Sequence, residues 1–316
     1  MTRYLSLRVL IIIPTLFATL MIVFLLGYLG PIDPVTILRS QWAAQGIYLN
    51  EEEVADLRSQ YGLDRPFHEQ FGTYMGNLLQ GNFGYSYTDA APIWPRIKRA
   101  LPVSGSLALG VIVIMAFVGI PLGIVAARFH NTWLDYSIVS GSLFFWSIPP
   151  YVLVPVMLII TVLWLDLMNV PRGWKGVMHP SFFVAAAIVS SRSLAGVIRQ
   201  TRGGILEVLQ NDYVRTARAK GLTEFKVMAR HVARNALIPV ITSLGLLVDD
   251  FMWGAVFLEL AFNLPGLGRL FVKQGIEVRD FNMINGVVLF TAGLTMAINL
   301  IVDLIYPFLD PRVAYD

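Results

Sequence analysis

Long apolar runs are the feature that most restricts the folds open to this chain. Six stretches carry about 20 or more mainly apolar residues, the length that an α-helix needs to cross the hydrocarbon core of a bilayer. Charged residues make up only 14% of the 316 residues, against about 25% in an average soluble domain. The sequence therefore predicts an all-α integral membrane protein, one domain over residues 1–316. We place its membrane helices at residues 9–29, 106–127, 136–165, 180–198, 237–260 and 284–308.

The third run is longer than a straight span needs, and it contains Pro149, Pro150 and Pro155. Proline removes a backbone hydrogen bond and clashes with the preceding turn. We therefore expect a kink or tilt in this span. A split at these prolines would change the count of six to five or seven.

Basic residues set the expected orientation of the chain. Segment 199–236 has eight Lys and Arg residues against three Asp and Glu. Short cytoplasmic loops are enriched in Lys and Arg, so this segment and both termini are expected in the cytoplasm, with residues 30–105 and 261–283 outside. Arg96, Lys98 and Arg99 lie at the end of the first outer segment and oppose the rule. That segment exceeds the roughly 60 residues over which the rule is reliable, so the prediction stands.

The first outer segment is long enough to contain helices of its own. Asn50 precedes three glutamates, which is typical of a capped helix start, and Gly62 is the expected stop. A second helix is expected to begin near Pro66, to carry an apolar face and to stop at Gly81. This helical cap either packs on the membrane helices or also serves to dock an external partner or gate access, and the residues do not decide between these roles.

The cytoplasmic segment 199–236 has regular helix signals. Leu206–Lys220 is expected to be helical, and Gly221 can adopt the left-handed conformation that ends a helix. Thr223 is a suitable cap for a second helix, whose apolar residues include Phe225. Two short, basic, amphipathic helices predict a docking element for a cytoplasmic partner. The alternative is a basic surface loop that only satisfies membrane topology.

Residues 212–222, with the sequence DYVRTARAKGL, resemble the coupling motif of ATP-binding-cassette import permeases. The continuation RHVARNALIP at 230–239 resembles the form in the dipeptide and oligopeptide branch. Similar matches occur in the same order along nearly the whole chain, and the long first outer segment resembles that of the B-type subunit. The chain departs from the broader permease motif because no Glu-Ala-Ala precedes the glycine. The segments that match the dipeptide and oligopeptide branch are the start of the chain, residues 61–66, 81–86 and 264–270, and the ending 303–312.

The resemblance implies the type I importer permease fold in the cell inner membrane, and a mechanism shared among several subunits. Two homologous permeases would enclose the path, two ATPase subunits would bind ATP and Mg below them, and an extracytoplasmic binding protein would deliver the solute. Small Ala217 and Ala219 would allow close approach to an ATPase, and basic side chains would pair with its acids. The expected ATPase-coupling residues are Asp212, Tyr213, Arg215, Ala217, Arg218, Ala219, Lys220 and Gly221.

Asp249 and Asp250 lie near the middle of the predicted fifth span. Carboxylates at that depth are costly and rarely face lipid. We expect at least one to line the translocation path and to favour substrates with positive charge. The alternatives are a structural pairing, for example with Arg192, or a protonated carboxyl. Glu259 and Asp303, near the ends of their spans, are expected to be structural.

Several functions are made improbable by what the sequence lacks. A P-loop of the form G-x-x-x-x-G-K-[ST] is missing, so ATP hydrolysis is expected only in partner subunits. The chain has no cysteine and four scattered histidines, which predicts no metal site, and we find no catalytic set. A net charge of +3 does not favour nucleic acid as a partner. Peptides are the leading substrate class, with oligosaccharides, nickel or other small solutes as alternatives, and an ion-coupled secondary transporter is the less favoured class.

Overall fold

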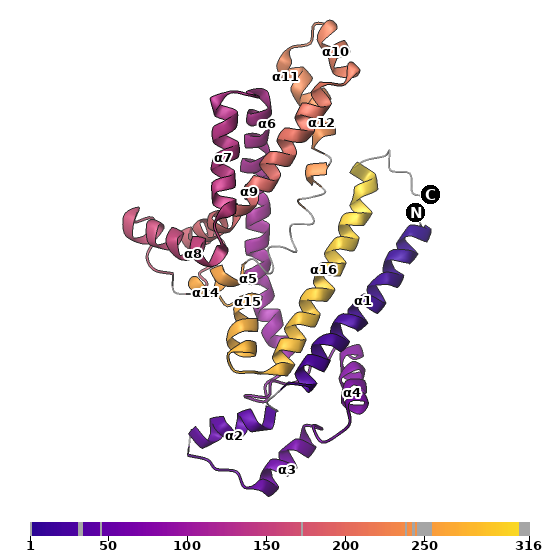
Figure 1. The fold of residues 1–316 in the computed structure, drawn as a ribbon, viewed down its shortest axis with the longest axis vertical. Coiled ribbons are helices and arrows are strands. Elements are labelled where there is room, and N and C mark those ends of the chain that lie inside the picture. The colour runs from indigo at the N-terminus through magenta and orange to yellow at the C-terminus, as the bar shows by residue number, and fades with distance from the viewer. Residues whose placement is uncertain are drawn as a thin grey trace. The chain divides into compact units, whose positions relative to one another are not determined.

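A computed structural model of the chain describes residues 2–30, 34–44, 46–171, 173–237, 239–241, 244 and 255–309 (Figure 1). The chain divides into two compact units, residues 1–102 with 265–296 and residues 103–264 with 297–316. The described residues form helices and no β-strand, apart from one isolated bridge between Tyr85 and Pro92. Much of the predicted fifth span, with Asp249 and Asp250, lies outside the described residues.

Among the described residues, four helices are long and apolar enough to cross a membrane, or five if one bent pair counts as a span. The all-α membrane fold is therefore confirmed. The four are Leu10–Tyr28, Ile93–Arg128, Pro180–Leu209 and Phe281–Leu304. The bent pair is α7 (Trp133–Ser147) with α8 (Pro150–Ile159) and the π-helical turn η2 (Ile160–Trp164), which meet at 107°. The break falls at Pro149 and Pro150, where the sequence predicts a kink.

The first unit begins with the membrane helix α1 (Thr2–Tyr28) and the cap helices α2 (Pro34–Ala44), α3 (Glu51–Gln60) and α4 (Phe67–Leu79). Asn50 and Glu53 form a reciprocal capping box, with both hydrogen bonds at 2.8 Å. Gly62 and Gly81 follow the ends of α3 and α4 with φ of +67° and +76°. The predicted start at Asn50 and the predicted stops at both glycines are confirmed.

The aromatic face of α4 packs on α1. Phe71 lies against Phe17 and Phe24, with ring centroids 5.7 and 5.4 Å apart. Tyr74 stacks on Phe24 at 5.3 Å, and Phe67 contacts Tyr28 at 5.2 Å. These contacts establish the packing role that the sequence allows for this helix. A docking or gating role of the cap stays a prediction.

Segments from distant parts of the sequence meet in the same unit. The first unit also contains four elements from later in the chain. They are the first turns of α5 (Ile93–Ile114), α15 (Leu267–Arg269), the π-helical turn η4 (Leu270–Ile276) and the first turns of α16 (Phe281–Leu309). Asp280 is fully buried, accepts a hydrogen bond from Ser86 Oγ at 2.5 Å and accepts the backbone N–H of Met283 at 3.0 Å. Burial raises the pKa of the Asp280 carboxyl above its usual value. Asp280 thus joins the loop before α5 to the start of α16.

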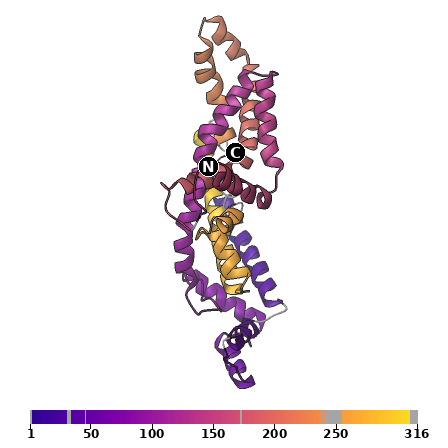
Figure 2. The same ribbon diagram turned by 90° about the vertical axis from the view of Figure 1, so that its left-hand side faces the viewer.

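The second unit is organised around α9 (Pro180–Leu209), which lies beside α7 in both views (Figures 1 and 2). The helical run that continues α5 through η1 (Met115–Gly119) and α6 (Ile120–Arg128) also packs on α9. A Cβ atom added to Gly123 would lie 2.5 Å from the Thr201 Cβ atom and 2.9 Å from the Ile198 carbonyl oxygen. Small residues are what permit such close approach between membrane helices.

The short helix α14 (Val256–Ala261) holds a buried carboxyl in the same unit. Glu259 is fully buried and accepts a hydrogen bond from Ser104 Oγ at 2.6 Å. Ser104 lies on α5, so this bond links the two helices across a core that includes Leu107, Leu258 and Phe262. The contact agrees with the structural role expected for Glu259.

Candidate functional site

The segment that follows α9, which the sequence predicts to be cytoplasmic, folds as a compact helical element. Its parts are α10 (Asp212–Ala219), α11 (Glu224–Lys226), the π-helical turn η3 (Val227–Val232) and α12 (Ala233–Ala236). Gly221 has φ of +76°. Its N–H donates to the Arg218 carbonyl at 2.9 Å, and the Leu222 N–H donates to the Ala217 carbonyl at 3.4 Å. These two bonds form a Schellman motif, so Gly221 ends α10 as the sequence predicts.

A small apolar core fixes this element to the rest of its unit. Val214 and Ala217, one turn apart on α10, are buried with Val227 and Val232 of η3. The other buried members come from three further helices: Ala127 of α6, Ile205 of α9 and Ala236 of α12. Ala217 is only 4% exposed, so we assign its side chain to anchoring α10 rather than to direct contact with a partner.

The opposite face of α10 is open to solvent. Tyr213 is 41% exposed, and the nearby Phe225 of α11 is 77% exposed. Exposed aromatic side chains on a basic surface favour a protein contact, because interfaces are enriched in aromatic residues. The remaining predicted coupling residues on this face are also exposed, namely Asp212, Arg215, Arg218, Ala219, Lys220 and Gly221.

The basic residues of this face differ in whether an ion pair already ties them to a neighbouring helix. Arg218 donates to both carboxylate oxygens of Glu224, at 2.8 and 3.4 Å, and so ties α10 to α11. Arg215 lies 3.5 Å from Asp212 on the same helix, with both side chains largely exposed. Within the described residues Lys220 makes no ion pair. Arg215 and Lys220 are therefore the cations best placed to meet acids of a partner.

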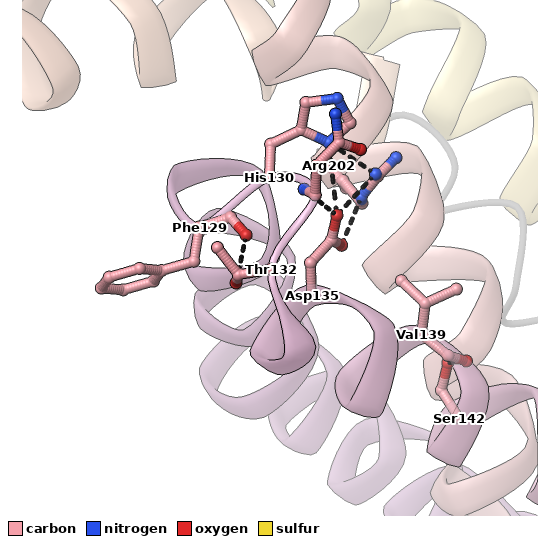
Figure 3. Close-up of polar contacts among 8 residues, drawn as sticks. Phe129, His130, Thr132, Asp135, Val139, Ser142 and Arg202 are labelled. Atoms are coloured by element: carbon pink, nitrogen blue, oxygen red, sulfur yellow. Dashed lines mark hydrogen bonds and ion pairs between the residues drawn. The ribbon is translucent and has the colours of Figure 1, made fainter.

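A buried ion pair connects α7 to α9, the helix that leads into α10 (Figure 3). Asp135, in the first turn of α7, has a side chain only 1% exposed. Arg202 of α9 donates to it through Nε at 2.7 Å and Nη2 at 2.8 Å, and the Asn131 backbone N–H adds a bond of 3.0 Å. His130 Nδ1 lies 2.8 Å from Arg202 Nη2 and 3.3 Å from Asp135 Oδ2, so the imidazole is part of the same cluster.

This cluster ties the turn between α6 and α7 to the last turns of α9. Because α9 leads directly into α10, this cluster connects the turn between α6 and α7 to the helix that carries α10. Sequence patterns alone do not point to Asp135 or His130, and Arg202 enters the sequence-based prediction only as one of the positive charges of segment 199–236. The sequence contained one signal for this pair, namely an acid (Asp135) at the start of one apolar run and an arginine (Arg202) near the end of another.

Family comparisons cover almost the entire chain. A model of the inner membrane component of binding-protein-dependent transport systems matches residues 119–315, and a model of the N-terminal part of such components matches residues 1–108. The chain belongs to this family. Its members are transport permease subunits, and the resemblance stated from the sequence is confirmed.

Named relatives agree with this assignment over their full lengths. The oligopeptide transport system permease protein AppB of Bacillus subtilis is 33% identical over 325 aligned positions, with 100% of both chains covered. The glutathione transport system permease protein GsiC of Escherichia coli K12 is 35% identical over 320 positions, again with 100% of both covered. The solved inward-facing MetNI methionine ABC transporter has a chain with a TM-score of 0.58 and 15% identity, covering 67% of this chain and 95% of that one. The permease fold of type I ABC importers is thus confirmed.

Proposed function

We propose that this chain is the B-type transmembrane subunit of an ATP-driven, binding-protein-dependent peptide importer in the cell inner membrane. The observation that carries the proposal is the folded element at residues 210–236. It presents Tyr213, Arg215, Lys220 and Phe225 outward, and it is anchored through α9 to the membrane helices. An element of this kind suits a permease that receives mechanical work from separate ATPases.

The proposed assembly contains a second homologous permease, two ATPase subunits that bind ATP and Mg, and an extracytoplasmic binding protein. Closure of the ATPases on ATP would push on α10, and the buried core below it would pass the displacement to α9 and α6. The reaction at the nucleotide belongs to the partners, and this chain supplies the path.

Peptides are the proposed substrate class because the relatives that match over their full lengths are named for oligopeptide and glutathione transport. Nothing in the described residues selects a peptide over an oligosaccharide or nickel. In this assembly the binding protein would make most of that choice. The permease would then discriminate mainly through charged groups along the path.

Asp249 and Asp250 are our proposed charged residues of the path. Replacing both by asparagine is expected to lower uptake of cationic peptides several-fold more than uptake of neutral peptides. The physical reason is that a carboxylate in a low-dielectric path attracts a cation strongly. Competition uptake with a lysine-containing peptide and its neutral analogue measures the ratio. Equal losses for both peptides would rule out this role.

The function is tested by co-purification of the tagged chain with the products of neighbouring genes, followed by ATPase assays in lipid. We expect a complex of two permeases and two ATPases, whose activity is stimulated by loaded binding protein. A chain that purifies without an ATPase and transports on an ion gradient would overturn the proposal.

A further inference from the structure

The basic residues at the end of the first outer segment oppose the charge bias expected of membrane proteins, and the structure shows where they gather. Arg96 and Arg99 lie on the first turns of α5, and Arg269 and Lys273 lie on α15 and η4. Although more than 160 positions separate the two pairs in the sequence, all four residues line a cavity of about 220 Å³. Arg96, Arg99 and Lys273 also line an adjoining cavity of about 390 Å³. Asp89 is the single carboxylate among the lining residues.

Hydrogen bonds hold the walls of these cavities together. Arg96 pairs with Asp89, and it also donates through Nη1 to Gln274 Oε1 at 2.7 Å. The second bond joins α5 to η4. Lys273 pairs with Glu277 at 2.6 Å, while Arg99 is exposed and makes no ion pair within the described residues. Arg99 therefore adds a positive charge to the cavity walls that no ion pair among the described residues offsets.

Both segments that form this cavity are predicted from the sequence to lie outside the membrane, because they belong to residues 30–105 and 261–283. The helical run Ile93–Arg128 has 36 residues, or about 54 Å at 1.5 Å per residue, which exceeds the roughly 30 Å hydrocarbon core. Ala127, near its end, packs in the same core as α10. The charge bias that places segment 199–236 in the cytoplasm therefore places the first turns of α5 in the outer compartment.

We propose that this basic cavity, lined by Arg96, Arg99, Arg269 and Lys273, receives acidic side chains of the extracytoplasmic binding protein. This inference rests on the proposed function, which requires the binding protein to meet the outer side of the permease in each cycle. Charge complementarity identifies the occupant as a carboxylate-bearing surface. Volumes of a few hundred cubic ångströms accommodate individual side chains and not a folded segment.

Complementary charges at an interface chiefly raise the association rate and make binding sensitive to salt. The double variant Arg99→Glu with Lys273→Glu is therefore expected to weaken binding of the loaded binding protein at least tenfold at low salt. The loss should shrink at high salt, where the Debye length falls from about 10 Å at 0.1 M to 3 Å at 1 M. The neutral pair Arg99→Gln with Lys273→Gln should lose less.

Lys98→Glu is the matched control. Lys98 lies beside Arg99 on the same helix and is exposed, but its ammonium lies over the Trp94 ring, 5.8 Å from the centroid, and it does not line either cavity. The same reversal of charge there should leave binding within about twofold of wild type, as expected for an isolated rim charge.

The experiment uses the assembled transporter in nanodiscs of phosphatidylcholine, with binding-protein affinity measured at two salt concentrations. Basal ATPase activity is measured in the same preparations. A wild-type chain without associated ATPase would refute the proposed function, whereas wild-type affinity in the double variant would refute only the cavity. Equal losses from Lys98→Glu and from the double variant would also overturn the inference, as would an effect that arises only in discs of anionic lipid. Recovery of affinity by an acid-to-lysine change on the binding protein would support it.

Discussion

Replacing Gly221 by valine is expected to lower ATP-dependent uptake at least tenfold while the chain still inserts in the membrane. Gly221 has φ of +76°, and a β-branched residue in the left-handed region costs on the order of 1–3 kcal/mol. A Cβ atom at this position would meet no neighbour within 4 Å. The cost therefore comes from the backbone alone, and it falls on an α10 of only 8 residues. We expect the end of α10 to unwind and to displace Leu222 and Phe225.

Gly221→Asn is the control for this prediction, because asparagine tolerates the left-handed conformation far better than valine does. We expect the asparagine variant to keep most of the uptake and of the ATPase stimulation by loaded binding protein. Both variants should be compared at equal amounts of permease in the membrane. Unchanged uptake in the valine variant, or an equal loss in both variants, would contradict the proposed role of this turn.

Helix ends were predictable because the signals that set them are local. Gly62, Gly81 and Gly221 each follow a helix with positive φ, and each was expected from glycine next to an amphipathic run. Phe225 shows where periodicity fails. The sequence suggests one continuous α-helix from Thr223 that carries Phe225 on its apolar face, but the π-helical turn η3 intervenes at Val227–Val232. The wider turn changes which residues face the core, so Val227 and Val232 are buried and Phe225 is exposed.

Contacts between distant segments were not predictable in the same way. Asp135 and Arg202 are 67 positions apart, and their pairing depends on how the turn at 129–132 presents α7 to α9. The basic cavity likewise could not be predicted from the sequence. The sequence shows Arg96 and Arg99 as exceptions to a charge rule, but only the fold brings Arg269 and Lys273 to them.

The buried pair gives the second large prediction, that Asp135→Ala both destabilises the protein and weakens coupling. Truncation leaves the Arg202 guanidinium and the Asn131 N–H without their shared acceptor. Breaking a buried pair costs about 3–5 kcal/mol. Arg202 keeps 25% of its side chain exposed, so solvent screening reduces our expectation to about 2–3 kcal/mol. Thermal unfolding in detergent should show the loss as a fall of several degrees in Tm.

Glu207→Ala provides the matched control, since Glu207 lies on the same helix as Arg202 and is exposed. It should change Tm and uptake little. If Asp135 and Arg202 act as one clamp, the double variant Asp135→Ala with Arg202→Ala will cost less than the sum of the single changes. Because the clamp joins α9 to the α6–α7 turn, uptake per ATP hydrolysed should fall in Asp135→Ala while basal ATPase activity persists. An unchanged ratio of uptake to hydrolysis, despite a lowered Tm, would limit the pair to a structural role and leave the apolar core beneath α10 as the route of coupling.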